Sequence, residues 1–230
     1  MDLRKSYLAL SKFEKGLWFT SLVVVVISYF AGNSFYLPAL IASLTGVTAL
    51  IFVAKGDVLG QILTIVFSLL YAWVSLQFRY YGEMITYLGM SAPSALLAVI
   101  SWLRHPFEGN AHEVSIAKLT RKQIIWGIVL SVAATALFGV VLFAFDTPNL
   151  LFSIISVTTS FLASYLTICR SPLYALAYSA NDVVLIILWV LASVEDPAYM
   201  PMILCFVMFL CNDLYGYCNW RRISIRQQKK

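Results

Sequence analysis

Long apolar stretches recur along the 230-residue chain, separated by short segments that carry polar and charged residues. A helix needs about 20 mostly apolar residues to cross a bilayer. Eight stretches approach or reach this length, so the pattern predicts an all-α membrane protein with eight transmembrane helices. They cover residues 17–31, 37–54, 58–78, 84–103, 124–145, 150–168, 173–194 and 199–218.

The apolar stretches indicate helices and not the strands of a membrane barrel. Barrel strands alternate apolar and polar residues over about ten positions, whereas segments 22–27 and 183–190 are apolar at every position. Most prolines near the stretches stand at predicted helix starts, where the missing N–H does little harm. Pro93 alone falls inside a predicted helix, the fourth, and it predicts a kink there.

The composition agrees with this interpretation. Apolar residues make up 61% of the chain, charged residues make up 12%, and the mean hydropathy is +0.84. A chain of this length cannot hide so much apolar surface from water. A soluble enzyme, a disordered chain and a nucleic-acid-binding domain are therefore excluded, and the expected partner is the lipid bilayer. The first stretch follows four basic residues, as a signal peptide does, but no small-residue cleavage site comes after it.

The basic residues predict the orientation in the membrane. With eight spans, both termini lie on one side, and fifteen of the 16 Lys and Arg residues fall in the tails and loops of that side. Only Arg79 falls in a loop of the other side. Because cytoplasmic loops collect Lys and Arg, we expect a multi-pass membrane protein with both termini in the cytoplasm. Recognition of anionic lipids by the basic tail is a second interpretation of the same charges.

Spans two to four resemble spans six to eight. Trp73 corresponds to Trp189 and Trp102 to Trp220, and the turn at Lys55 corresponds to the turn at Arg170. We therefore expect one transporter domain with two parallel three-helix repeats, joined by a linker helix and preceded by an extra helix. Chance similarity of apolar helices is the alternative. The expected parts are the extra helix at 17–31, the first repeat at 37–103, a cytoplasmic loop and linker helix at 104–145, the second repeat at 150–218 and a basic cytoplasmic tail at 219–230.

Two Asn-Asp pairs fall at membrane depth. Asn181 and Asp182 lie in the middle of span seven, and Asn212 and Asp213 lie within span eight. A carboxylate in hydrocarbon usually faces a cavity or a partner, yet no Lys or Arg lies in the central part of any predicted span. A cationic substrate supplies the missing charge in one interpretation, and a proton neutralises the aspartate in another. Hydration from the cytoplasm is a third, mainly for Asp213.

Aromatic residues share a helix face with Asp182. Tyr178 lies four residues before it and Trp189 seven residues after it, which places the three on one side of span seven. Such a stripe suits a flat cationic ring through stacking and cation–π attraction. The alternative for Trp189 is a place in the interfacial aromatic belt. Glu83 lies beside Arg79 at the predicted outer mouth, where a salt bridge and the attraction of cations compete as interpretations.

Other kinds of site lack sequence support. The chain has no phosphate-binding loop of the Gly-x-x-x-x-Gly-Lys-Ser/Thr type. His105 and His112 lie together in one loop without further ligands at metal-site spacing. We therefore expect neither enzymatic activity nor a bound cofactor or metal.

Three stretches carry a family resemblance: "GEMITYLGMSAPSALLAVISWLRHPFEGN", "SANDVVLIILWV" and "CNDLYGYCNWRR". They resemble the PnuC family of vitamin transporters and are most similar to its nicotinamide riboside transporters. The resemblance implies a fold similar to that of SWEET sugar transporters, import of nicotinamide riboside by facilitated diffusion with alternating access, and a homotrimer. The family also contains thiamine and riboflavin importers, which remain alternatives. A proton-coupled transporter of another small polar solute is a further alternative.

The resemblance implies that the polar residues at membrane depth form the substrate-binding site. Asp182 is expected to face the pyridinium ring, with Tyr178 and Trp189 stacked on it. Asparagine and tyrosine side chains are expected to bind the ribose or the carboxamide, and two residues of the first repeat to complete the pocket. The predicted binding residues are Gln61, Tyr71, Tyr178, Asn181, Asp182, Trp189, Asn212 and Tyr215.

Overall fold

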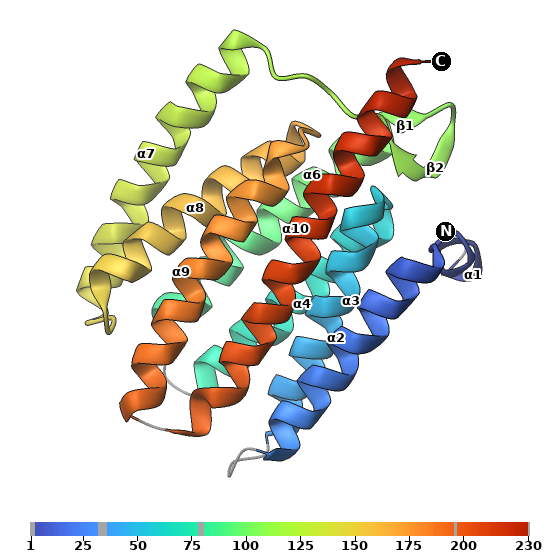
Figure 1. The fold of residues 1–230 in the computed structure, drawn as a ribbon. Helices are drawn as coiled ribbons and strands as arrows, with labels where there is room; N and C mark the ends of the chain where they lie inside the picture. Colours follow the sequence, from blue (N-terminus) through green and yellow to red (C-terminus); the bar gives the residue numbers. More distant parts are fainter. Residues whose placement is uncertain (1–2, 32–35, 78–80, 196, 230) are drawn as a thin grey trace.

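The structure is a computed structural model that describes residues 3–31, 36–77, 81–195 and 197–229. Within them it contains eight helices long and apolar enough to cross a membrane (Figure 1). Seven of these are unbroken: α2 (Lys12–Ala31), α3 (Leu37–Lys55), α4 (Val58–Gln77), α7 (Arg121–Ala144), α8 (Leu150–Ile168), α9 (Leu173–Glu195) and α10 (Met200–Gln228). The all-α architecture and the eight helices predicted from the sequence are thus confirmed.

The remaining span is composite, because α-helical hydrogen bonding is interrupted in its middle. It runs through α5 (Tyr81–Thr86), a π-helical turn η1 (Tyr87–Ser91) and α6 (Ala92–Arg104). The interruption ends two residues before Pro93, which is the second residue of α6. Proline has no N–H to donate and its ring clashes with the carbonyl four residues back. The wider turn relieves this conflict, so the irregularity expected from Pro93 takes the form of a π-helical turn.

Both termini lie at the same end of the bundle, which we call the terminal end (Figure 1). It carries the short helix α1 (Leu3–Leu8) and an antiparallel hairpin of β1 (Pro106–Phe107) and β2 (Asn110–Val114). Helix α10 reaches this end and continues to Gln228, although the sequence predicted a basic tail from residue 219. The tail is helical because Trp220 and Ile223 are buried against the rest of the protein. Every Lys and Arg of the described residues belongs to this end.

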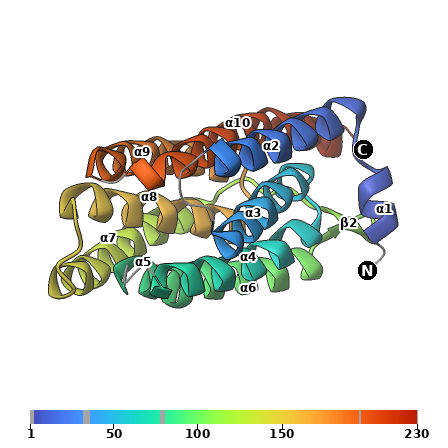
Figure 2. The same ribbon diagram turned by 90° about the horizontal axis from the view of Figure 1, so that it is seen from below.

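The helices form a flattened bundle with α2 and α7 at its two edges. Seen from below, α9, α10 and α2 follow one side and α4, α5 and α6 follow the opposite side (Figure 2). Helix α10 packs against α9, α3 and α2, and α8 packs against α7, α9 and α6. Helices that are distant in sequence therefore meet in the centre of the bundle, where the polar residues of the predicted site lie.

Two bends at the terminal end have the same backbone geometry. Gly56, after α3, and Arg170, after α8, both have a positive φ, of 76° and 58°. In each bend the next residue caps the following helix: the N–H of Leu59 donates to Asp57 at 2.9 Å, and the N–H of Leu173 donates to Ser171 at 3.3 Å. The two halves of the chain thus make bends of the same kind, in which Gly56 and Arg170 have equivalent positions.

Candidate functional site

A cavity lies between α3, α4, η1, α8, α9 and α10, in the middle of the bundle. About 720 Å³ of space lies between its atoms, part of it open to the outside. Its wall combines polar and aromatic side chains from both halves of the chain, among them Gln61, Thr64, Phe67, Ser68, Tyr87, Ser91, Ser160, Ser164, Tyr178, Asn181, Asp182, Phe206, Phe209 and Asp213.

Two aspartates line this cavity together. Asp182 of α9 and Asp213 of α10 are 3% and 4% exposed. The Oδ2 atom of Asp182 has no hydrogen-bond partner among the described residues. No Lys, Arg or His of the described residues lines the cavity. The centre of the cavity therefore offers negative charge that the protein does not balance.

Hydroxyl groups of α8 hold two side chains of α9 in place. Ser156 and Thr159 both donate to Oδ1 of Asn181, at 3.1 and 2.9 Å. The hydroxyl groups of Ser164 and Tyr178 are 3.1 Å apart. Because Oδ1 of Asn181 is already engaged, its NH₂ group is oriented to donate. A ligand with oxygen acceptors fits such a donor.

Aromatic rings form the opposite wall. The ring of Phe67 lies 5.8 Å from those of Tyr87 and Phe209, in edge-to-face geometry, and Phe206 lies 5.3 Å from Phe209. Gly46 makes room for them: a Cβ there would stand 2.5 Å from Cζ of Phe209 and 3.2 Å from Phe67. Faces of aromatic rings near a carboxyl pair suit a flat cation.

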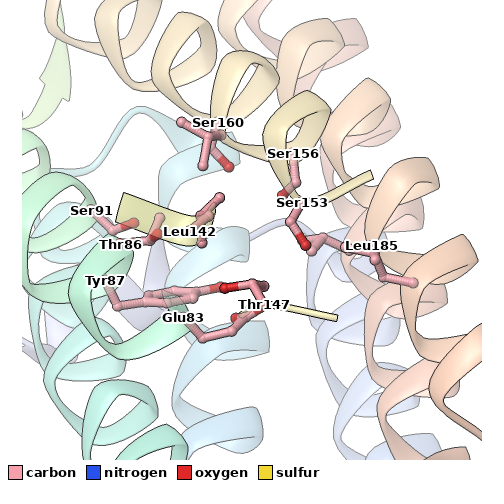
Figure 3. A pocket seen from close by; sticks show the side chains of 12 residues that line it. Glu83, Thr86, Tyr87, Ser91, Leu142, Thr147, Ser153, Ser156, Ser160 and Leu185 are labelled. Atoms are coloured by element: carbon pink, nitrogen blue, oxygen red, sulfur yellow. The ribbon is translucent and has the colours of Figure 1, made fainter. Parts of the chain in front are cut away.

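Two further pockets continue the cavity toward the end opposite the termini. Figure 3 shows the first, where Glu83, Thr86, Tyr87 and Ser91 face serines of α8. It shares Tyr87, Ser91, Ser160 and Leu185 with the central cavity. The second shares Glu83, Thr147, Ser153 and Leu188 with the first and extends to Trp189, Glu195 and Tyr199. The three pockets adjoin one another from the two aspartates to that end of the bundle.

The structure brings four of the eight predicted binding residues to the central cavity: Gln61, Tyr178, Asn181 and Asp182. Tyr71 stands behind the wall, with its ring 4.4 Å from that of Tyr87. Trp189 lines the outermost pocket and stacks on Phe206 at 6.5 Å. Arg79, predicted beside Glu83, lies outside the described residues.

The other two predicted residues face α2 instead of the cavity. The amide of Asn212 donates to Ser21 at 2.9 Å and to the carbonyl of Met208 at 2.7 Å. The hydroxyl of Tyr215 donates to Glu14 at 2.9 Å, and Glu14 also pairs with Lys55 at 3.3 Å. Both side chains thus join the extra helix α2 to the second half of the chain.

The cavity also contains residues that we did not predict as binding residues. Asp213 is the most important, and Tyr87, Ser91, Ser160 and Ser164 accompany it. One sequence signal for the serines is their spacing: Ser160 and Ser164 lie four residues apart on α8, as Thr64 and Ser68 do on α4. No group of three or more His, Cys, Asp or Glu that could hold a metal occurs among the described residues.

Comparisons with known proteins agree on one family. The sequence model described as nicotinamide mononucleotide transporter matches residues 36–222. The nicotinamide riboside transporter PnuC of Neisseria mucosa is 29% identical over 192 residues, covering 82% of this chain and 73% of the relative. The protein of that name from Haemophilus influenzae is 28% identical over 189 residues, covering 82% and 80%. The crystal structure of the vitamin B3 transporter PnuC superimposes with a TM-score of 0.83 at 26% identity, covering 99% of this chain and all of the other.

Proposed function

The chain belongs to the nicotinamide mononucleotide transporter family, that of PnuC, and on this premise we propose that it carries nicotinamide riboside across a membrane. It is a multi-pass membrane protein of a transporter family and not an enzyme. The single observation that carries the proposal is the buried, unbalanced pair of Asp182 and Asp213 in a cavity with aromatic walls. Nicotinamide riboside is a flat pyridinium cation with a ribose, and its charge matches this cavity.

The charge of the cavity favours the riboside over the mononucleotide named in the family description. A phosphate group is bound in proteins by Arg, Lys or backbone N–H groups. The described lining residues offer neither Arg nor Lys, and two carboxyl groups would repel the phosphate. The same argument favours a cation over neutral riboflavin. Thiamine is also a cation, but it lacks the ribose and carboxamide that suit Asn181.

We assign the polar residues to parts of the substrate. Asp182, with Asp213 in the same cavity, balances the pyridinium charge. The rings of Tyr87 and Tyr178 form the walls of the space for the flat ring. The NH₂ group of Asn181 donates to the carboxamide or to ribose oxygens. Gln61, from the first half of the chain, completes the polar wall. Of the other predicted residues, Trp189 binds the substrate on its way through the outer pocket, and Tyr71, Asn212 and Tyr215 support the wall from behind.

The mode of transport is facilitated diffusion with alternating access. The two halves of the chain meet at the cavity, and a rocking motion between them would open it to one side at a time. The terminal end lies on the cytoplasmic side of a bacterial inner membrane, because it carries the Lys and Arg residues that cytoplasmic loops collect. The pockets that run to the opposite end then form the outer entrance. We further propose a homotrimer, which native mass spectrometry of the purified protein tests.

A binding panel on the purified protein tests the substrate. Isothermal titration with nicotinamide riboside, nicotinamide mononucleotide, thiamine and riboflavin compares the four in one buffer. We expect the riboside to bind at least tenfold more tightly than each of the others, which corresponds to about 1.4 kcal/mol. Tighter binding of the mononucleotide than of the riboside would overturn the charge argument. Tighter binding of thiamine or riboflavin would make that vitamin the substrate instead.

A further inference from the structure

We propose that residues 112–117, which we call the inner strap, are the gate at the terminal end of the carrier. The strap stays on the first half of the chain and leaves the second half when the cavity opens to the cytoplasm. This inference rests on the proposed function, because it names the contacts that the proposed rocking motion has to break. Neither the family match nor the relatives address these residues.

The strap is bonded to both of the equivalent bends. The N–H of Val114 donates to the carbonyl of Gly56 at 2.9 Å. The N–H of Ala117 donates to the carbonyl of Arg170 at 3.0 Å, and the guanidinium of Arg170 donates to the carbonyl of Ser115 at 3.1 Å. An extended chain reaches at most about 3.6 Å per residue, so the three steps from Val114 to Ala117 span about 11 Å. The bends cannot separate beyond this reach while both attachments persist.

The strap also contributes to an apolar cluster between the cavity and the terminal end. Val114 belongs to one cluster with Val53, Trp102 and Trp220, and Val53 lines the cavity as well. Figure 1 shows the hairpin of β1 and β2 beside the last turns of α10 at this end. The two further pockets lead to the opposite end. A passage from the cavity to the terminal end therefore has to open through this cluster and past the strap.

The attachment to the first half is buried. Nδ1 of His112 lies 3.2 Å from Oδ2 of Asp57, and the hydroxyl of Ser6 donates to the same oxygen at 2.6 Å. Asp57, Ser6 and Val114 are each 1% exposed. Removal of the strap from this side would expose Val114 to water and take a partner from a buried carboxyl group. This attachment is therefore the costlier of the two to break.

The attachment to the second half is polar and nearer to water. The side-chain amide of Gln227, on α10, accepts from the N–H of Ile116 at 2.8 Å. It donates to the carbonyl of Val114 at 3.0 Å and to Oε1 of Glu113 at 2.9 Å. Arg226, whose side chain is 55% exposed, pairs with the same oxygen of Glu113. Water replaces such partners at little net cost when they separate, so the strap parts from the second half first.

Hydrogen exchange of the wild-type protein tests this order of release. The amides of Ile116 and Ala117 are bonded to the second half, and that of Val114 is bonded to the first. Mass spectrometry with fragmentation that resolves single amides should show protection factors about tenfold lower for Ile116 and Ala117 than for Val114. Equal protection of the three amides, or weaker protection of Val114, would overturn the inference.

A reversible cross-link tests the gate itself. With the four cysteines replaced by alanine, Glu113→Cys and Gln227→Cys place one thiol on the strap and one on α10. A short bis-methanethiosulfonate reagent joins the two thiols, and dithiothreitol separates them. The joined protein should bind nicotinamide riboside as before in calorimetry. Its exchange of labelled riboside in proteoliposomes should slow about tenfold or more and recover on reduction.

A cross-link to the first half is the matched control. Ser6→Cys and His112→Cys place thiols where the two side chains are 3.0 Å apart. Joining them should leave the exchange rate unchanged, because the strap stays on this side. Full exchange with the strap joined to α10, or an equal block from both cross-links, would overturn the inference and leave the proposed function intact. Absence of riboside binding and exchange in the wild-type protein would overturn the proposed function instead.

Discussion

Trp102 and Trp220 pack against each other, and each donates a hydrogen bond to the opposite half of the chain. Their ring centroids are 5.4 Å apart, and neither side chain is exposed. The indole N–H of Trp102 donates to the carbonyl of Thr167 at 3.0 Å, and that of Trp220 donates to the carbonyl of Val53 at 2.9 Å. Thr167 is near the end of α8 and Val53 near the end of α3, so the exchange is reciprocal and joins the halves at the terminal end.

Trp102→Phe and Trp220→Phe should each lower the thermal stability of the protein in detergent. Each change removes one hydrogen bond to a carbonyl that keeps a backbone donor, the N–H of Arg170 or of Gly56, so the loss is about 0.5–1.5 kcal/mol. Because the two rings are in contact, the double variant should deviate from the sum of the single effects. Circular dichroism melting measures the effect. Trp126→Phe is the control, since Trp126 is 59% exposed. Equal stability of the Trp220→Phe variant and this control would contradict a joining role.

Gly46→Ala should weaken substrate binding while leaving the fold intact. The added methyl group meets the far end of the Phe209 ring at 2.5 Å and therefore pushes this ring into the cavity. We expect about a tenfold loss of affinity, measured by titration with nicotinamide riboside. Gly139→Ala is the matched control, because a Cβ there meets Ile154 at an ordinary distance of 3.7 Å. Unchanged affinity in Gly46→Ala would place the ligand away from the Phe209 wall.

Removal of the two hydroxyl groups that engage Asn181 should weaken binding. In the double variant Ser156→Ala, Thr159→Ala the amide loses both donors to Oδ1 and is free to present either end to the ligand. We expect a loss of about 1–3 kcal/mol in binding free energy. The control is Thr45→Ala, whose exposed hydroxyl bonds only to the carbonyl of Ile41 in its own helix. If the double variant and Thr45→Ala bind the riboside with the same affinity, the two hydroxyl groups do not position Asn181 for the substrate.

Asp182→Asn should weaken binding of the cationic nicotinamide riboside. It should not weaken binding of the reduced dihydronicotinamide riboside, which has nearly the same shape but no charge. The variant removes the negative charge and retains the size of the side chain, so the loss should be about 1.5–3 kcal/mol for the cation alone. Competition binding with both ligands measures the difference. The control is Glu195→Gln at the exposed outer rim. A variant that loses both ligands equally would show that Asp182 acts through shape instead of charge.

The spans could be predicted because a bilayer demands long apolar helices, and the pattern of residues 150–168 predicted α8 to the residue. The end of α10 could not, since Trp220 and Ile223 are buried by tertiary contacts with the hairpin end of the protein and not by lipid. Pro93 predicts an irregularity in the fourth span from the sequence, but it does not predict a π-helical turn. Its register, which turns Tyr87 and Ser91 toward the cavity, depends on packing.

The polar residues of the site could be found as exceptions in apolar helices, but their directions could not all be assigned. Asn212 and Asp213 are neighbours in sequence and point about 100° apart around α10. Asn212 bonds to Ser21 of α2, and Asp213 lines the cavity together with Asp182. Tyr215 was expected at the cavity, yet its partner Glu14 lies 201 positions away in the sequence. Helical periodicity shows which residues share a face, but the partner of that face depends on the tertiary fold.

Uptake of labelled nicotinamide riboside into proteoliposomes tests the central claim most directly. Vesicles that contain the purified wild-type protein and are loaded with unlabelled riboside should take up the label rapidly, and those loaded with nicotinamide mononucleotide should not. The Asp182→Asn variant in matched vesicles should show slower exchange. The label should not exceed its outside concentration in unloaded vesicles, because facilitated diffusion only equalises concentrations. Exchange no faster than in empty liposomes, or equal exchange against the mononucleotide, would contradict the account.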